Sequence, residues 1–107
     1  MRITVEGKGG PLVVKLAGIA GGIRLYDEEI AAAVAAGFRV AALDVSGDRV
    51  DDPPNRPLDW DLYADEVQEA IDRAVETRAL VWGTSFGCMI SLAVASRYPE
   101  RISGLLL

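Results

Sequence analysis

The sequence predicts an α/β fold with three layers, in which helices cover both faces of a mostly parallel, twisted sheet. From the second expected strand onward, short apolar runs alternate with longer helical segments, which is the pattern of strand–helix–strand units with right-handed crossovers. The inner strands are apolar at almost every position, as expected of strands buried on both faces. Half of the 107 residues are apolar and no linker or repeat interrupts them, so we expect a single domain over 1–107.

The first half of the chain supplies two strands, a loop and a helix. Polar and apolar residues alternate over 2–6, which predicts a half-exposed edge strand. A glycine-rich turn at 7–11 leads to a buried strand over 12–17, and a second glycine-rich loop at 18–22 leaves that strand. Residues 26–36 are rich in alanine and begin with three acidic residues, which favour the amino end of a helix.

The second half continues the alternation. A third buried strand is expected over 38–43, followed by a polar loop with three prolines over 44–57. Apolar residues recur every three to four positions over 59–76 and predict an amphipathic helix. After a further strand and helix, the Tyr-Pro-Glu-Arg run at 98–101 ends the helix because proline cannot continue it, and 102–107 begin a fifth strand.

A Gly-Thr-Ser-Phe-Gly sequence at 83–87 stands between an apolar strand over 79–82 and a long apolar helix. This is the G-x-S-x-G pattern in the strand–turn–helix context that a nucleophile elbow requires. A serine on so tight a turn takes a strained backbone conformation, and side chains two residues to either side would collide with it, which explains Gly83 and Gly87. The pattern predicts that Ser85 is a nucleophile; the alternative is an ordinary glycine-rich turn with an unreactive serine.

The same turn predicts a place for negative charge. The backbone N–H of Phe86 lies at the amino end of the expected helix, where the helix dipole and unpaired N–H groups stabilise a developing oxyanion.

Charge and composition limit the partners. The net charge is −5 and the acidic residues are scattered, which argues against nucleic acid or an anionic membrane as partner. No apolar run approaches the roughly 20 residues of a membrane span, and the amino-terminal residues are too polar for a signal sequence. Cys88 is the single cysteine, so no internal disulfide is available and we expect a cytoplasmic protein.

Two ligand motifs are nearly matched, but neither is complete. Acidic and hydroxyl residues alternate as in a calcium loop, but Arg49 and Asn55 stand where glycine and glutamate are needed, so we expect no metal. The alternating residues are Asp44, Ser46, Asp48 and Asp52. The loop at 18–22 lacks the second and third glycines of a dinucleotide fingerprint, so no cofactor is expected. Cys88, Trp60, Tyr63 and Trp82 are interpreted as core residues, and the acidic residues at 65–72 as a solvated helix face.

Over essentially its whole length the chain resembles the amino-terminal part of an α/β-hydrolase, of the single-domain esterase, lipase and haloperoxidase group. The resemblance is carried, in family order and spacing, by Gly10–Val14, Leu16–Gly22, Gly37–Asp44, Gly83–Met89 and Tyr98–Ile102. It implies a serine hydrolase that acts on a small-molecule ester or related acyl substrate through an acyl-Ser85 intermediate. It also implies that the strands ending at Ala17 and Trp82 are neighbours, and that the backbone N–H groups of Ile19 and Phe86 form the oxyanion hole.

The chain departs from this family in what it lacks. Ala17 stands where a histidine is usual, and Ser46 where an arginine is common. Family members complete a catalytic triad with a later Asp or Glu and a His, but this sequence contains no histidine. We therefore expect a truncated α/β-hydrolase core, whose general base and acid come from elsewhere.

The expected strand over 102–107 is apolar and would form an open sheet edge, at which a second copy or a complementing chain could pair. The alternative function is thus a non-catalytic interaction module, or an inactive hydrolase remnant, that pairs through this edge.

Overall fold

The computed structural model describes residues 1–17, 22–47 and 55–107. Its centre is a five-stranded sheet in the order β1-β3-β2-β4-β5. The strands are β1 (Arg2–Glu6), β2 (Leu12–Leu16), β3 (Arg39–Asp44), β4 (Ala79–Gly83) and β5 (Ile102–Leu106). β1 runs antiparallel to β3 along one edge, and all other neighbours are parallel. The predicted, mostly parallel sheet is thereby confirmed.

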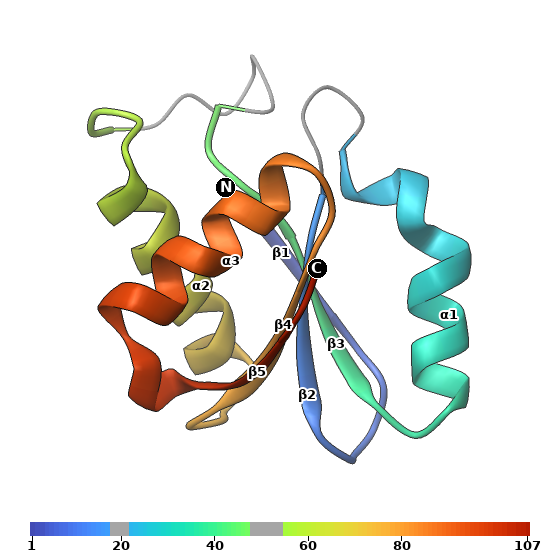
Figure 1. Ribbon diagram of the computed structural model, residues 1–107. Helices are drawn as coiled ribbons and strands as arrows, with labels where there is room; N and C mark the ends of the chain where they lie inside the picture. Colours follow the sequence, from blue (N-terminus) through green and yellow to red (C-terminus); the bar gives the residue numbers. More distant parts are fainter. Residues whose placement is uncertain (18–21, 48–54) are drawn as a thin grey trace.

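Helices cover both faces of this sheet (Figure 1). α1 (Asp27–Ala35) lies on one face, and α2 (Trp60–Arg73) and α3 (Phe86–Arg97) lie together on the other. Two short 3-10 helices, η1 (Ile23–Tyr26) and η2 (Pro99–Arg101), precede α1 and β5. The three layers are those expected from the alternation of strands and helices.

The main core lies between the sheet and the α2–α3 pair. Its fully buried members come from β2, β3, β4, α2 and α3, and include Val14, Leu43, Val67, Ile71, Val81 and Ile90. A smaller cluster under α1 joins Ile30 to Val40 and Ala42 of β3. Burial of strand residues on both faces explains why β2 and β3 are so apolar.

One prediction for α2 is wrong. Glu66 was expected on a solvated face, but its side chain is buried and accepts hydrogen bonds from the backbone N–H of Ser46, at 2.9 Å, and from the Ser46 hydroxyl. These two donors, from the segment after β3, take the place of the water molecules that would hydrogen-bond an exposed carboxylate. A buried polar group is tolerated when it is hydrogen-bonded in this way. The helix periodicity is satisfied, but one polar position faces the protein.

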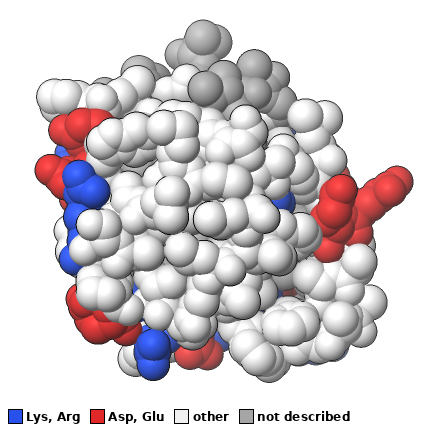
Figure 2. All heavy atoms as spheres, in the orientation of Figure 1, with Lys and Arg blue, Asp and Glu red and all other residues white. Residues whose placement is uncertain are grey.

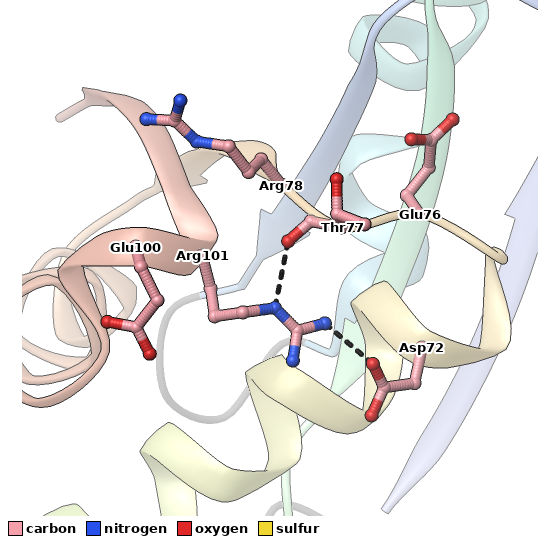
Figure 3. Close-up of a pocket in the computed structure, with 6 residues that line it drawn as sticks. All are labelled: Asp72, Glu76, Thr77, Arg78, Glu100 and Arg101. Carbon is pink, nitrogen blue, oxygen red and sulfur yellow. Dashed lines mark hydrogen bonds and ion pairs between the residues drawn. The ribbon is translucent and has the colours of Figure 1, made fainter.

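The Tyr-Pro-Glu-Arg run joins the end of α3 to α2. The Tyr98 hydroxyl donates to Asp65 Oδ1 at 2.7 Å. Arg101 donates to the Thr77 carbonyl oxygen at 2.8 Å and to Asp72 Oδ1 at 2.6 Å, across a shallow pocket of about 470 Å³ (Figure 3). The pocket lies before the start of β4, at the opposite end of that strand from Ser85. These contacts give the run a structural role: it fixes how β5 enters the sheet.

Candidate active site

Ser85 lies at the turn between β4 and α3, as the sequence predicts. Its side chain is exposed, and its backbone has φ 56° and ψ −116°. A positive φ is unfavourable for a residue with a Cβ atom, so this is a strained turn that persists only because its surroundings hold it. The turn raises the hydroxyl at the carboxyl end of β4, directly before the first turn of α3.

The two flanking glycines are required by space. A Cβ atom on Gly83 would lie 2.4 Å from the Gly87 carbonyl oxygen and 2.6 Å from Ser91 Oγ. A Cβ atom on Gly87 would lie 2.8 Å from the carbonyl oxygen of Leu16. Real Cβ atoms do not approach backbone oxygens so closely, so glycine at 83 allows the turn to pack against α3 and glycine at 87 allows it to pack against β2.

Backbone hydrogen bonds attach the turn to the neighbouring strand. β2 pairs with β4 so that Leu16 lies opposite Gly83, which confirms that the strands ending near Ala17 and Trp82 are adjacent. The Thr84 N–H donates to the Leu16 carbonyl oxygen at 3.3 Å, and the Gly87 N–H donates to that of Thr84 at 2.9 Å. Cys88 is half-buried, and its thiol donates to the Gly83 carbonyl oxygen at 3.2 Å, so it supports the turn.

Phe86 is the first residue of α3. Its N–H is therefore one of the first-turn N–H groups that have no acceptor within the helix. Ile19, the other predicted oxyanion donor, lies outside the described residues. The loop that carries it re-enters the described structure at Gly22. There, buried Asp44 at the end of β3 accepts from the Ile23 N–H at 2.8 Å. Asp44 therefore fixes the return of this loop to the fold.

Three aromatic rings form one wall beside the turn. The Phe86 ring lies 5.7 Å from the Trp60 ring and 5.5 Å from the Tyr63 ring, measured between centroids. Trp60, expected in the core, is 37% exposed. The amphipathic pattern of α2 placed Trp60 and Tyr63 on its apolar side but could not show that they would meet Phe86.

Sequence reasoning missed Lys15 at this site. Its side chain is fully buried in β2, and its Nζ donates to Thr84 Oγ1 at 2.7 Å. The ammonium also faces the rings of Tyr26 and Trp82, with Nζ 4.3 Å and 4.2 Å from their centroids. Burial lowers the pKa of Lys15, against smaller raising effects of Glu29 and Cys88. The available signal was a lysine in the middle of an apolar strand.

Of the four residues considered for a calcium loop, the structure describes two. Asp44 and Ser46 are buried and hydrogen-bonded to Ile23 and Glu66, whereas Asp48 and Asp52 lie outside the described residues. Within 1–17, 22–47 and 55–107, no group of three or more acidic, cysteine or histidine side chains is arranged to hold a metal ion. In the same ranges, no helix is both long and apolar enough to cross a membrane.

The sequence profile of the alpha/beta hydrolase fold matches residues 11–107. The chain belongs to the alpha/beta hydrolase fold family. No curated protein sequence gave a significant match.

Solved structures agree with this membership. A hydrolase from Pseudomonas aeruginosa superimposes with a TM-score of 0.87 at 25% identity, over 98% of this chain and 40% of its own. A carboxylesterase structure from Nitrososphaera gargenis gives 0.86 at 20% identity, over 97% and 39%. The enol-lactonase of Burkholderia xenovorans gives 0.84 at 24% identity, over 97% and 41%. The chain thus spans about two fifths of the length of these neighbours.

Proposed function

We propose that this chain carries the nucleophile of a serine hydrolase, which acts on a small-molecule ester or related acyl substrate through an acyl-Ser85 intermediate. The observation that carries the proposal is the backbone of Ser85: an exposed serine with φ 56°, held at the amino end of α3 between two glycines that nothing larger can replace. A strained turn of this kind at a helix terminus favours a catalytic role over a structural one.

In the proposed reaction, Ser85 Oγ attacks the acyl carbon as a base removes the hydroxyl proton. The bond to the leaving alcohol then breaks, and that alcohol takes up the proton. The N–H of Phe86, together with that of Ile19, would stabilise the tetrahedral oxyanion. Water attacks the acyl-serine in the second half and releases the acid. The 107 residues contain no histidine, so we propose that the base, and its Asp or Glu partner, come from sequence outside them.

The structural neighbours support an acyl substrate. Two of them are named as a carboxylesterase and an enol-lactonase, and both names describe cleavage of an ester bond. Since the chain spans about two fifths of each, the remaining part of such a protein would supply the base and most of the substrate pocket. With one cysteine and no disulfide partner, we place this enzyme in the cytoplasm.

Labelling with a fluorophosphonate probe tests the proposal on the protein in its native assembly. We expect the wild type to be labelled and Ser85→Ala to lose the label. Ser103→Ala is the matched control, since it removes an exposed hydroxyl from β5, and it should be labelled like the wild type. Equal labelling of the wild type and Ser85→Ala would contradict the proposed nucleophile.

The second candidate is a non-catalytic module that pairs through β5. Among the described strands β5 has a single neighbour, β4; Leu105 and Leu106 are exposed on it, and so is Leu107 directly after it. The surface in view in Figure 2 is almost free of charge at its centre, with charged residues gathered at its margins. The native mass separates the two candidates: a longer or histidine-bearing assembly favours the hydrolase, whereas this chain alone or its multiples favour the module.

A further inference from the structure

Lys15 is explained neither by the core nor by the proposed catalytic groups. It is fully buried in β2 between apolar residues, where a leucine or methionine would fill the same space. Burial of an ammonium is unfavourable unless other groups replace its water. Its three N–H groups meet three described partners: the Thr84 hydroxyl and the faces of the Tyr26 and Trp82 rings. None of these partners carries a negative charge.

The partners converge on the turn that carries Ser85. Trp82 lies directly opposite Lys15 in the β2–β4 pairing, and Thr84 follows two residues later, next to Ser85. Tyr26 comes from η1, at the return of the loop that leaves β2. One buried charge therefore connects β2, β4 and η1 at the edge of the sheet where the nucleophile is expected.

Thr84 is held at three points. Its N–H donates to the Leu16 carbonyl oxygen at 3.3 Å, its carbonyl oxygen accepts from the Gly87 N–H at 2.9 Å, and its hydroxyl accepts from Lys15 at 2.7 Å. The strained conformation of Ser85 persists only while its neighbours are fixed. The contact from Lys15 is the one of the three that depends on a side chain, and so the one that a substitution can remove cleanly.

We propose that Lys15 is a positioning residue for Ser85, acting through the Lys15–Thr84 hydrogen bond. This inference rests on the proposed function, because it assigns a role at the same site. A charged donor is suited to the role, since hydrogen bonds from ionised groups are shorter and stronger than neutral ones. The groups that face the ammonium or influence its charge are Tyr26 on η1, Glu29 on α1, Trp82 on β4, Thr84 in the turn after β4, and Cys88 on α3.

A double-mutant cycle, measured on the protein in its native assembly, tests the proposal. Lys15→Met removes the donor and keeps the length of the side chain, and Thr84→Val removes the acceptor and keeps its shape. Each single variant should lower the rate of fluorophosphonate inactivation at saturating probe by about ten-fold, the effect of losing one charged hydrogen bond. The double variant should fall no further than either single one, because both remove the same contact. Lys8→Met, which removes an exposed lysine before β2, should react like the wild type.

Two further readouts separate positioning from general support of the fold. Lys15→Met should unfold at the same or a higher urea concentration than the wild type, because it relieves the burial of a charge. It should also shift the backbone amide resonances of Ser85 and Phe86, and Thr84→Val should shift them in the same direction.

The outcomes distinguish the two proposals. If wild-type Ser85 does not react in the native assembly, the proposed function fails, and the amide resonances alone decide the role of Lys15. Unshifted Ser85 and Phe86 resonances in Lys15→Met would overturn the positioning role. Additive losses of inactivation rate, or a loss explained by lower stability, would overturn it as well.

Discussion

At the scale of single residues, the proposed function depends on a strained serine. With φ 56° and ψ −116°, Ser85 occupies a conformation that costs about 1–3 kcal/mol for a residue with a Cβ atom. Ser85→Gly should therefore raise the free energy of unfolding by about 1 kcal/mol, after the extra freedom of glycine in the unfolded chain is subtracted. Urea denaturation measures this. Ser103→Gly, in the extended strand β5, should instead lower it; a drop for both would show that Ser85 is not strained.

The elbow glycines give the opposite prediction. Gly83→Ala and Gly87→Ala force a Cβ atom against backbone oxygens at 2.4 Å and 2.8 Å, so each should destabilise the protein by about 1–3 kcal/mol. Gly9→Ala is the control, since nothing lies within 4 Å of its added Cβ atom. A urea midpoint equal to that of Gly9→Ala would contradict the close packing of the turn on α3 for Gly83→Ala, and on β2 for Gly87→Ala.

Residue patterns predicted this turn because its chemistry is local: spacing, glycine and the strand–helix context all lie within a few positions. The burial of Lys15 and Glu66 was not predicted because the partners of both side chains are distant in sequence. Lys15 meets Thr84 across the β2–β4 pairing, and Glu66 meets Ser46 from the segment after β3. A buried charge is visible in a sequence only as an exception to periodicity; which partner stabilises it depends on the strand order.

At the scale of elements, the helices and strands were predicted more accurately than their ends. The helix expected over 59–76 ends at Arg73, and Asp59 is its cap, with its side chain accepting from the Leu62 N–H at 2.8 Å. The helix expected over 26–36 begins as the 3-10 turn η1, with α1 starting at Asp27. Such boundaries are decided by capping hydrogen bonds and by the anchor of Ile23 on Asp44, which periodicity does not encode.

The contact between α3 and α2 has a pH dependence. Hydrogen bonds from Tyr98 and then Arg56 lower the pKa of Asp65. The ionised Asp65 carboxylate therefore contributes fully to the stability of the fold above the ordinary pKa of an aspartate. This contribution is lost as the pH falls through the lowered pKa. Tyr98→Phe should weaken this acid-side dependence, by a modest amount because Asp65 is partly exposed. Urea midpoints at acidic and neutral pH measure it, with Tyr26→Phe, on the other face of the sheet, as control. If the difference between the urea midpoints at acidic and neutral pH were the same in Tyr98→Phe as in the wild type, this would contradict the role of this hydrogen bond.

At the scale of the whole molecule, β5 is an edge strand of the described sheet and exposes apolar side chains. β5 exposes Leu106 by 50%, and Met89 and Leu92 on α3 are also exposed. An apolar edge strand pairs readily with another chain, and a lysine on it opposes pairing. We expect the isolated 107-residue chain to self-associate, and Leu106→Lys to reduce this in sedimentation velocity. Leu25→Lys, an equal charge change on η1, should not. Equal association of Leu106→Lys and the wild type would place the contact elsewhere.

The proposed function requires that Ser85 form a covalent acyl intermediate. The most direct measurement is to mix the protein, in its native assembly, with an activated acetyl ester, quench in acid, and determine by peptide mass spectrometry which residue carries the acetyl group. We expect acetylation of Ser85, with none on the corresponding peptide of Ser85→Ala. An unmodified Ser85 while the ester is hydrolysed, or acetylation confined to another residue, would contradict it.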